Sequence, residues 1–278
     1  MRSATFSAFD THFGRSAGIR FARLASGTRI AWAASGRGPP LVRVAHWMTH
    51  VEQDLQSPLW RPWRSRLNQS VQLVRYDERG TGASIAAVES ITLANLVNDV
   101  FAVLDAHGIE RCVLAAESSG ALTALSAALQ PPQRISGWVI VDGMVFRGLD
   151  SATGPFLKGL QHAYPATLDR FVDLCMPDEG PAHIKRWGRQ IIDGAAPEAA
   201  IALRRLNSEA DLRADLPKIR QPTLIIHCEG DKIMPVEQAR TLAKTLPNAE
   251  LVILKDSGHI PTMTRPAEIA AQSERFFA

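Results

Sequence analysis

Two adjacent serines stand where an apolar run of the sequence, VLAAESSGAL, gives way to the next element. A serine exposed at a sharp turn from strand to helix needs small residues two positions before and after it, because larger side chains would collide with strand and helix. Ser118 meets this condition, since Ala116 and Gly120 flank it, whereas Ser119 has the bulky Glu117 two positions before it. The pattern predicts Ser118 as a nucleophile, the alternative being a buried serine that caps a helix.

A serine nucleophile needs a general base and a group that orients this base. Two later turns supply both, in the chain order serine, acid, histidine. Asp231 follows the apolar run PTLIIHCEG, and His259 follows AELVILKD within the segment SGHIP, where Gly258 lets the chain turn. We predict that His259 removes the proton of Ser118 and that Asp231 holds the imidazole tautomer.

The elements around these residues alternate between strand-like and helix-like patterns. GIRFARL and TRIAWAA predict a hairpin, PPLVRVA and VQLVRYD predict strands, and residues 92–108 predict an amphipathic helix that stops at Gly108. RCVLAA, GWVIVDG, PTLIIHCEG and AELVILKD are further apolar runs separated by helical stretches. This alternation is typical of an α/β fold, a mostly parallel central sheet of about eight strands flanked by helices. The carboxyl ends of the strands would bring the three side chains to one edge.

The alternation is interrupted once, between residues 147 and 217. This segment is too long for a simple crossover, and it contains helical patterns such as ATLDRFVDLC and PEAAIALRRLNSEADLR. We predict a helical cap over 147–217, a core formed by 18–146 and 218–278, and an N-terminal extension over 1–17. The alternative is that the inserted helices merely extend the core.

These motifs resemble those of the α/β-hydrolase family over nearly the whole chain, from about Gly18 to Phe277. YDERGTGAS is similar to the family's D-x-R-G-x-G-x-S turn, AESSGAL to its nucleophile turn, CEGDKIMP to its acid turn and DSGHIP to its histidine turn. In the nucleophile turn, Ala116 replaces the first glycine of G-x-S-x-G. The stretch VAHWMTHVEQDLQSPLWRPW is similar to hydrolase-type domains fused to bacterial helix-turn-helix regulators.

The resemblance implies an oxyanion hole made by the backbone N–H groups of Trp47 and Ser119. His46 stands where the family has a glycine, so its backbone must avoid positive φ. The resemblance also offers Asp142, at the end of VIVD, as an alternative acid. The candidates for the substrate pocket are His46, Met48, Trp60, Trp63, Met144, Phe146 and Ile260.

Other polar residues have structural interpretations. His46 and His50 lie four residues apart, but no third ligand in a pattern such as HExxH follows, so a structural or pocket role is favoured over a metal site. His227, inside an apolar run, is expected to be a core histidine. Glu117 would hydrogen-bond below the turn rather than tune the serine. We expect no metal and no cofactor.

Composition restricts the partners and the compartment. The 31 basic residues are spread among 28 acidic ones without a long run of either charge, which argues against nucleic-acid binding. Three distant cysteines without CxxC spacing indicate a reduced, cytoplasmic protein. No signal-peptide core or membrane span is visible. We expect a monomer or a homodimer.

The sequence as a whole predicts a serine hydrolase that cleaves a small, mainly apolar carboxylic ester or lactone through an acyl-enzyme intermediate. The same three residues could serve a carbon–carbon bond hydrolase or a perhydrolase. A ligand-binding sensor on the hydrolase scaffold, without turnover, is the alternative from another functional class.

Overall fold

The computed structural model describes most of the chain, namely residues 18–130, 134–146, 150–175, 182–255 and 257–277. The predicted N-terminal extension, residues 1–17, lies outside this part. Among the described helices, none combines the length and the hydropathy that crossing a bilayer requires.

Apolar runs of the sequence build one eight-stranded sheet in the order β1-β2-β4-β3-β5-β6-β7-β8. β1 and β2 form the predicted antiparallel hairpin, and β2 also pairs antiparallel with β4. All other neighbouring strands are parallel, which confirms the predicted α/β fold. The strands are β1 Arg20–Arg23, β2 Arg29–Gly36, β3 Pro40–Arg43, β4 Gln72–Tyr76, β5 Cys112–Glu117, β6 Ile135–Val141, β7 Thr223–Cys228 and β8 Ala249–Leu254.

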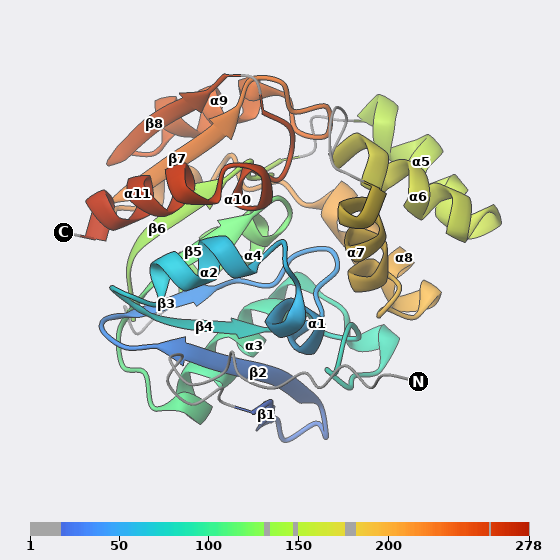
Figure 1. Ribbon diagram of the computed structural model, residues 1–278, viewed down its shortest axis with the longest axis horizontal. Coiled ribbons are helices and arrows are strands. Elements are labelled where there is room, and N and C mark those ends of the chain that lie inside the picture. The colour runs from blue at the N-terminus through green and yellow to red at the C-terminus, as the bar shows by residue number, and fades with distance from the viewer. Residues whose placement is uncertain (1–17, 131–133, 147–149, 176–181, 256, 278) are drawn as a thin grey trace, which may run out of the picture.

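Helices cover both faces of the sheet (Figure 1). One face is buried under α3, α4 and α9, which share a single apolar cluster with strand residues such as Leu114 and Ile140. The other face is buried mainly under α2 and α11, whose apolar residues join a second cluster with Leu224 and Ile226. Because both faces are covered, the inner strands are apolar throughout rather than alternating. These helices are α2 Arg61–Leu67, α3 Leu93–His107, α4 Gly120–Ala128, α9 Val236–Thr245 and α11 Pro266–Phe277, and α1 Val51–Gln56, α10 Pro261–Thr264 and the 3₁₀ turns Val88–Ser90 and Leu216–Lys218 complete the connections.

Between β6 and β7, in the segment predicted as a cap, the described residues form four α-helices. They stand together to the right of the sheet in Figure 1, beyond the ends of the parallel strands. Leu160, Leu168 and Leu203 from these helices form an apolar cluster of their own, into which Trp47 and Met48 project from the core. The helices are α5 Asp150–His162, α6 Tyr164–Cys175, α7 Ala182–Ile192 and α8 Pro197–Glu209.

A buried ion pair ties the turn after β4 to helix α3. Arg79 donates from Nε to Asp99 Oδ2 at 2.8 Å and from Nη2 to Asp99 Oδ1 at 2.5 Å, and both side chains are at most 2% exposed. Arg79 Nη1 also donates to Thr28 Oγ1 at 3.2 Å. The arginine of the YDERGTGAS motif therefore holds three segments together. Two buried charges in this fork geometry stabilise the fold only while both are present.

We predict that Asp99→Ala lowers the free energy of unfolding by about 3–5 kcal/mol, because it leaves the guanidinium of Arg79 buried and unpaired. Urea unfolding monitored by circular dichroism would measure this loss. Asp105→Asn on the same helix is the matched control, since the Asp105 side chain is 68% exposed in its pair with Arg134 and should contribute less than about 1 kcal/mol. Equal losses in the two variants would contradict this role of Asp99.

Candidate active site

Ser118 occupies a strained turn between β5 and α4. Its φ is +49°, in the left-handed region that non-glycine residues rarely adopt. Ser118 N donates to Val141 O at 3.1 Å, which holds the turn against β6. A Cβ on Gly120 would lie 2.9 Å from Ala45 O, so the helix can approach the end of β3 only with glycine there. This explains the small residue two positions after Ser118 and favours the predicted sharp turn from strand to helix over a buried serine that caps a helix.

The structure brings Ser118, His259 and Asp231 into one chain of hydrogen bonds. His259 Nε2 lies 2.9 Å from Ser118 Oγ, and His259 Nδ1 lies 2.7 Å from Asp231 Oδ2. Asp231 Oδ1 accepts from the backbone N–H groups of Ile233, at 2.6 Å, and Met234, at 2.9 Å, which fixes the carboxylate. The three residues come from the loops after β5, β7 and β8, as the sequence order predicted.

The electrostatics of the pair favour a charged His259. Burial alone would lower the pKa of His259, but the charge and hydrogen bond of Asp231 outweigh it and raise this pKa above its ordinary value. Burial would raise the pKa of Asp231, yet His259 holds it below its ordinary value. The carboxylate is therefore suited to stabilise an imidazolium.

Asp142, the alternative acid, lies beside this pair but makes a different contact. One atom each of Asp142, Asp231 and His259 lie within 4.8 Å of one another. Asp142 Oδ1 accepts from Cys228 N at 2.7 Å, and burial raises the pKa of Asp142 well above its ordinary value. The hydrogen bond to His259 Nδ1 belongs to Asp231.

The loop after β3 places the backbone amide of Trp47 next to the nucleophile turn. Trp47 N donates to Ser119 Oγ at 3.1 Å, and the indole Nε1 donates to Ala200 O of α8 at 2.8 Å. Among the described residues, Ser118 and Asp142 are the non-glycine residues with positive φ, so His46 accommodates the missing glycine without that strain.

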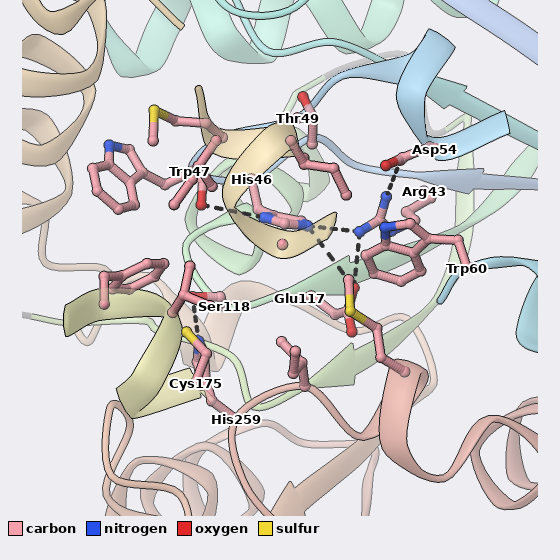
Figure 2. Close-up of a pocket in the computed structure, with 18 residues that line it drawn as sticks. Arg43, His46, Trp47, Thr49, Asp54, Trp60, Glu117, Ser118, Cys175 and His259 are labelled. Atoms are coloured by element: carbon pink, nitrogen blue, oxygen red, sulfur yellow. Dashed lines mark hydrogen bonds and ion pairs between the residues drawn. The ribbon is translucent and has the colours of Figure 1, made fainter. Parts of the chain in front are cut away.

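A pocket opens onto Ser118 and His259 (Figure 2). The space inside the pocket together with its open mouth is about 670 Å³. The predicted residues His46, Met48, Trp60 and Ile260 line it. The remaining lining residues are Arg43, Trp47, Thr49, Asp54, Glu117, Phe171, Val172, Cys175, Gly188, Ile191, Ile192 and Met263.

Three predicted pocket residues lie elsewhere, and the prediction was wrong for them. Trp63 is 3% exposed and belongs to the apolar cluster between α2 and the sheet. Met144 is 4% exposed in the core on the opposite face, and Phe146 packs against that same core with its ring 4.9 Å from the guanidinium of Arg213. Their side chains turn toward the sheet faces, a direction that proximity in sequence to a strand end does not determine.

Sequence reasoning missed two groups of lining residues. Phe171, Val172, Ile191 and Ile192 come from α6 and α7, and nothing in their local patterns distinguishes a pocket face from a core face. Arg43 did carry a signal, because a charged residue ending the apolar run PPLVRVA requires a buried partner.

Two predicted structural residues occupy the positions expected of them. His227 Nε2 donates to Met234 O at 2.9 Å inside the core. Glu117 accepts hydrogen bonds from Arg43 Nη2 at 3.0 Å and from Thr262 Oγ1, below the nucleophile turn.

His46 forms part of the pocket wall. Its Nε2 accepts from Arg43 Nη2 at 2.6 Å, and burial together with the charge of Arg43 lowers the pKa of His46 well below its ordinary value. The ring is therefore neutral, with its acceptor nitrogen already engaged.

Comparison with known proteins agrees with this geometry. Residues 45–272 match the model of the alpha/beta hydrolase family. The chain is 30% identical to a pimeloyl-[acyl-carrier protein] methyl ester esterase from Nitrosomonas europaea, over 85% of this chain and 95% of that protein. It is 28% identical to a putative carbamate hydrolase RutD from Stutzerimonas stutzeri, over 74% and 81% of the two chains.

Solved structures show the same fold. An esterase from Exiguobacterium antarcticum superposes with a TM-score of 0.84 at 21% identity, over 92% of this chain and 98% of that one. The enol-lactonase from Burkholderia xenovorans superposes with a TM-score of 0.80 at 23% identity, over 93% and 99% of the two chains. The family match agrees with the eight-stranded sheet and with the strained turn that carries Ser118. The chain therefore belongs to the α/β-hydrolase family.

Proposed function

We propose that the protein is a serine esterase in which Ser118, His259 and Asp231 form the catalytic triad. The observation that carries the proposal is the continuous chain of hydrogen bonds from Asp231 through His259 to Ser118 at the wall of the pocket. The relatives named as an esterase and a carbamate hydrolase support an acyl-transfer reaction on this scaffold.

The mechanism follows from the positions of these atoms. His259 Nε2 removes the proton of Ser118 as Oγ attacks the carbonyl carbon of the ester, and Asp231 stabilises the resulting imidazolium. The imidazolium then protonates the departing alkoxide, leaving an acyl-enzyme. Water deprotonated by His259 attacks the acyl carbon, and the collapse of the second tetrahedral intermediate releases the carboxylic acid and restores Ser118.

Two backbone amides would stabilise the oxyanion. The N–H of Ser119 lies at the start of α4, and the N–H of Trp47 faces the same turn, where Ser119 Oγ accepts its hydrogen bond. For Trp47 to bind a substrate oxygen, the Ser119 hydroxyl must release this amide. Hydrogen-bond donors that point at the position of the developing oxyanion stabilise the transition state more strongly when water is excluded from the site.

The pocket favours a small, largely apolar acyl group. Aromatic and aliphatic side chains from Trp47, Met48, Phe171, Ile191 and Ile260 form much of its wall. We propose that α5–α8 act as a cap, because α6 and α7 contribute Phe171 and Ile191 to the wall of the pocket that Ser118 and His259 also line. Linear esters and lactones both fit this description, and the chemistry at Ser118 is the same for both.

We predict that Ser118→Ala lowers kcat for p-nitrophenyl ester hydrolysis by at least about 10⁴-fold, because no other group replaces the nucleophile. Ser119→Ala is the matched control and should stay within about tenfold, since its backbone N–H remains and Trp47 N is freed. A series from acetate to decanoate, followed by release of p-nitrophenolate, measures both. Binding without turnover of any ester or lactone would support the sensor alternative instead.

A pair of isosteric variants can show which of the two candidate acids orients His259. Asp231→Asn should lower kcat about 10⁴-fold, because the imidazole loses its orienting carboxylate. Asp142→Asn should remain within about tenfold, because the amide oxygen still accepts from Cys228 N. Steady-state kinetics with p-nitrophenyl butyrate would measure both variants, and the reverse order of effects would assign the acid to Asp142.

The pH dependence should report the raised pKa of His259. Catalysis needs the neutral imidazole, so kcat/KM should fall as the pH decreases through a pKa above the ordinary value of about 6.5. In Asp231→Asn the residual kcat/KM should fall at a lower pH than in the wild type, because the side chain that raises the pKa of His259 has lost its charge. A wild-type midpoint below that of the variant would contradict the assignment.

A further inference from the structure

The pocket has a polar end formed by buried charges, and the triad mechanism does not use them. Arg43, at the end of β3, donates from Nη1 to Asp54 Oδ2 at 3.2 Å and from Nη2 to Glu117 Oε2 at 3.0 Å. All three side chains are at least nine-tenths buried, and all three line the pocket. The guanidinium carbon of Arg43 stacks 3.9 Å from the ring centre of Trp60. In Figure 2, Arg43, Asp54 and Trp60 lie on the side of the pocket away from Ser118.

Several polar atoms at this end have unused hydrogen-bonding capacity. Within the described part of the chain, Asp54 Oδ1, Arg43 Nε and Trp60 Nε1 are buried and have no hydrogen-bond partner. A buried polar atom without a partner is unfavourable by about 1–3 kcal/mol, so native proteins usually satisfy such atoms with protein, water or ligand. One acceptor and two donors therefore belong to residues that line one pocket. Because these atoms have almost no exposed surface, a polar ligand group reaches them only after the side chains around them shift.

The charges of the cluster balance, which restricts the ligand group to a neutral one. Asp54 and Glu117 carry two negative charges, and both contact Arg43. The second positive charge is Arg75, which lies opposite Arg43 on β4 and is buried. The charge of Asp54 raises the pKa of Arg75 against the effect of this burial. A carboxylate arriving here would meet two acidic side chains beside a guanidinium whose Nη1 and Nη2 are already engaged. An alkyl terminus would leave the acceptor and both donors without partners.

We propose that this end of the pocket, defined by Arg43, Asp54 and Trp60, recognises a neutral substrate group that both donates and accepts hydrogen bonds. A primary amide or a hydroxyl at the end of the acyl chain has this chemistry. Its N–H or O–H donates to Asp54 Oδ1, and its oxygen accepts from Arg43 or Trp60. The inference rests on the proposed esterase function and adds the class of substrate to it.

The first test uses the wild-type protein and three p-nitrophenyl esters of equal acyl length, which end in a methyl group, a primary amide or a carboxylate. We expect kcat/KM for the amide to exceed that for the methyl ester by at least about tenfold, with the carboxylate lowest. Equal or better turnover of the methyl ester would overturn the proposal. Preference for the carboxylate would overturn the neutral-group assignment.

p-Nitrophenyl acetate, which is too short to carry a terminal group, separates this proposal from the proposed function. If acetate is hydrolysed but the amide is not preferred, the polar-end inference fails and the esterase function stands. If no ester is hydrolysed, the proposed esterase function fails. The polar end of the pocket can then still be tested by isothermal titration calorimetry, which measures the binding of heptanamide and of heptane-1-sulfonate to the wild-type protein. Binding of the amide over the sulfonate supports the proposal, and the opposite order overturns it.

Two variants assign the preference to specific residues. Asp54→Asn removes the free carboxylate oxygen, and Trp60→Phe removes the indole N–H while keeping an aromatic ring below Arg43. Each should reduce the amide-to-methyl ratio of kcat/KM several-fold, whereas the exposed Asp105→Asn should leave this ratio unchanged. If Asp54→Asn fails to fold, Trp60→Phe and the wild-type ratio still decide the question. An unchanged ratio in a folded Asp54→Asn would overturn the role of this residue.

Discussion

The backbone of Ser118 is the constraint on which the site depends. A left-handed conformation of Ser118, directly after β5, lets the chain turn from the strand into α4. This turn exists only because Gly120 lets α4 approach the carbonyl of Ala45 and because Ser118 N bonds to Val141 O. Strain of this kind persists where the surrounding structure fixes it from several sides. Neighbouring parallel strands provide that support here.

Different hydrogen-bond partners give similarly buried carboxylates different tasks. Asp231 and Asp142 both lie near His259, yet Asp231 is held by two backbone amides and the imidazole, whereas Asp142 bonds a backbone amide of β7. Asp99 bonds the guanidinium of Arg79 and joins segments far apart in sequence. In each case the partner, rather than the residue type, decides whether the carboxylate joins the proposed triad or a structural contact.

The site divides its work between two parts of the chain. The sheet and its loops position the proposed triad, in which His259 Nε2 lies within hydrogen-bonding distance of Ser118 Oγ. The helices between β6 and β7 supply much of the apolar wall, including Phe171 and Ile191. Precise geometry therefore comes from paired strands, and the shape of the pocket comes from helices that pack over their ends.

The sequence by itself determined the fold class, the hairpin and parallel strands, the serine turn and the chain order of the three side chains of the proposed triad. These are local signals, because strand runs, glycines and small flanking residues are constrained by their immediate neighbours. The tertiary structure alone separated Asp231, the predicted partner of His259, from its alternative Asp142. It alone also placed Trp63 and Met144 in the core and brought Arg43 to Asp54 and Glu117 in the pocket. Those outcomes depend on side-chain direction and on contacts between residues distant in sequence, for which periodicity and spacing carry no information.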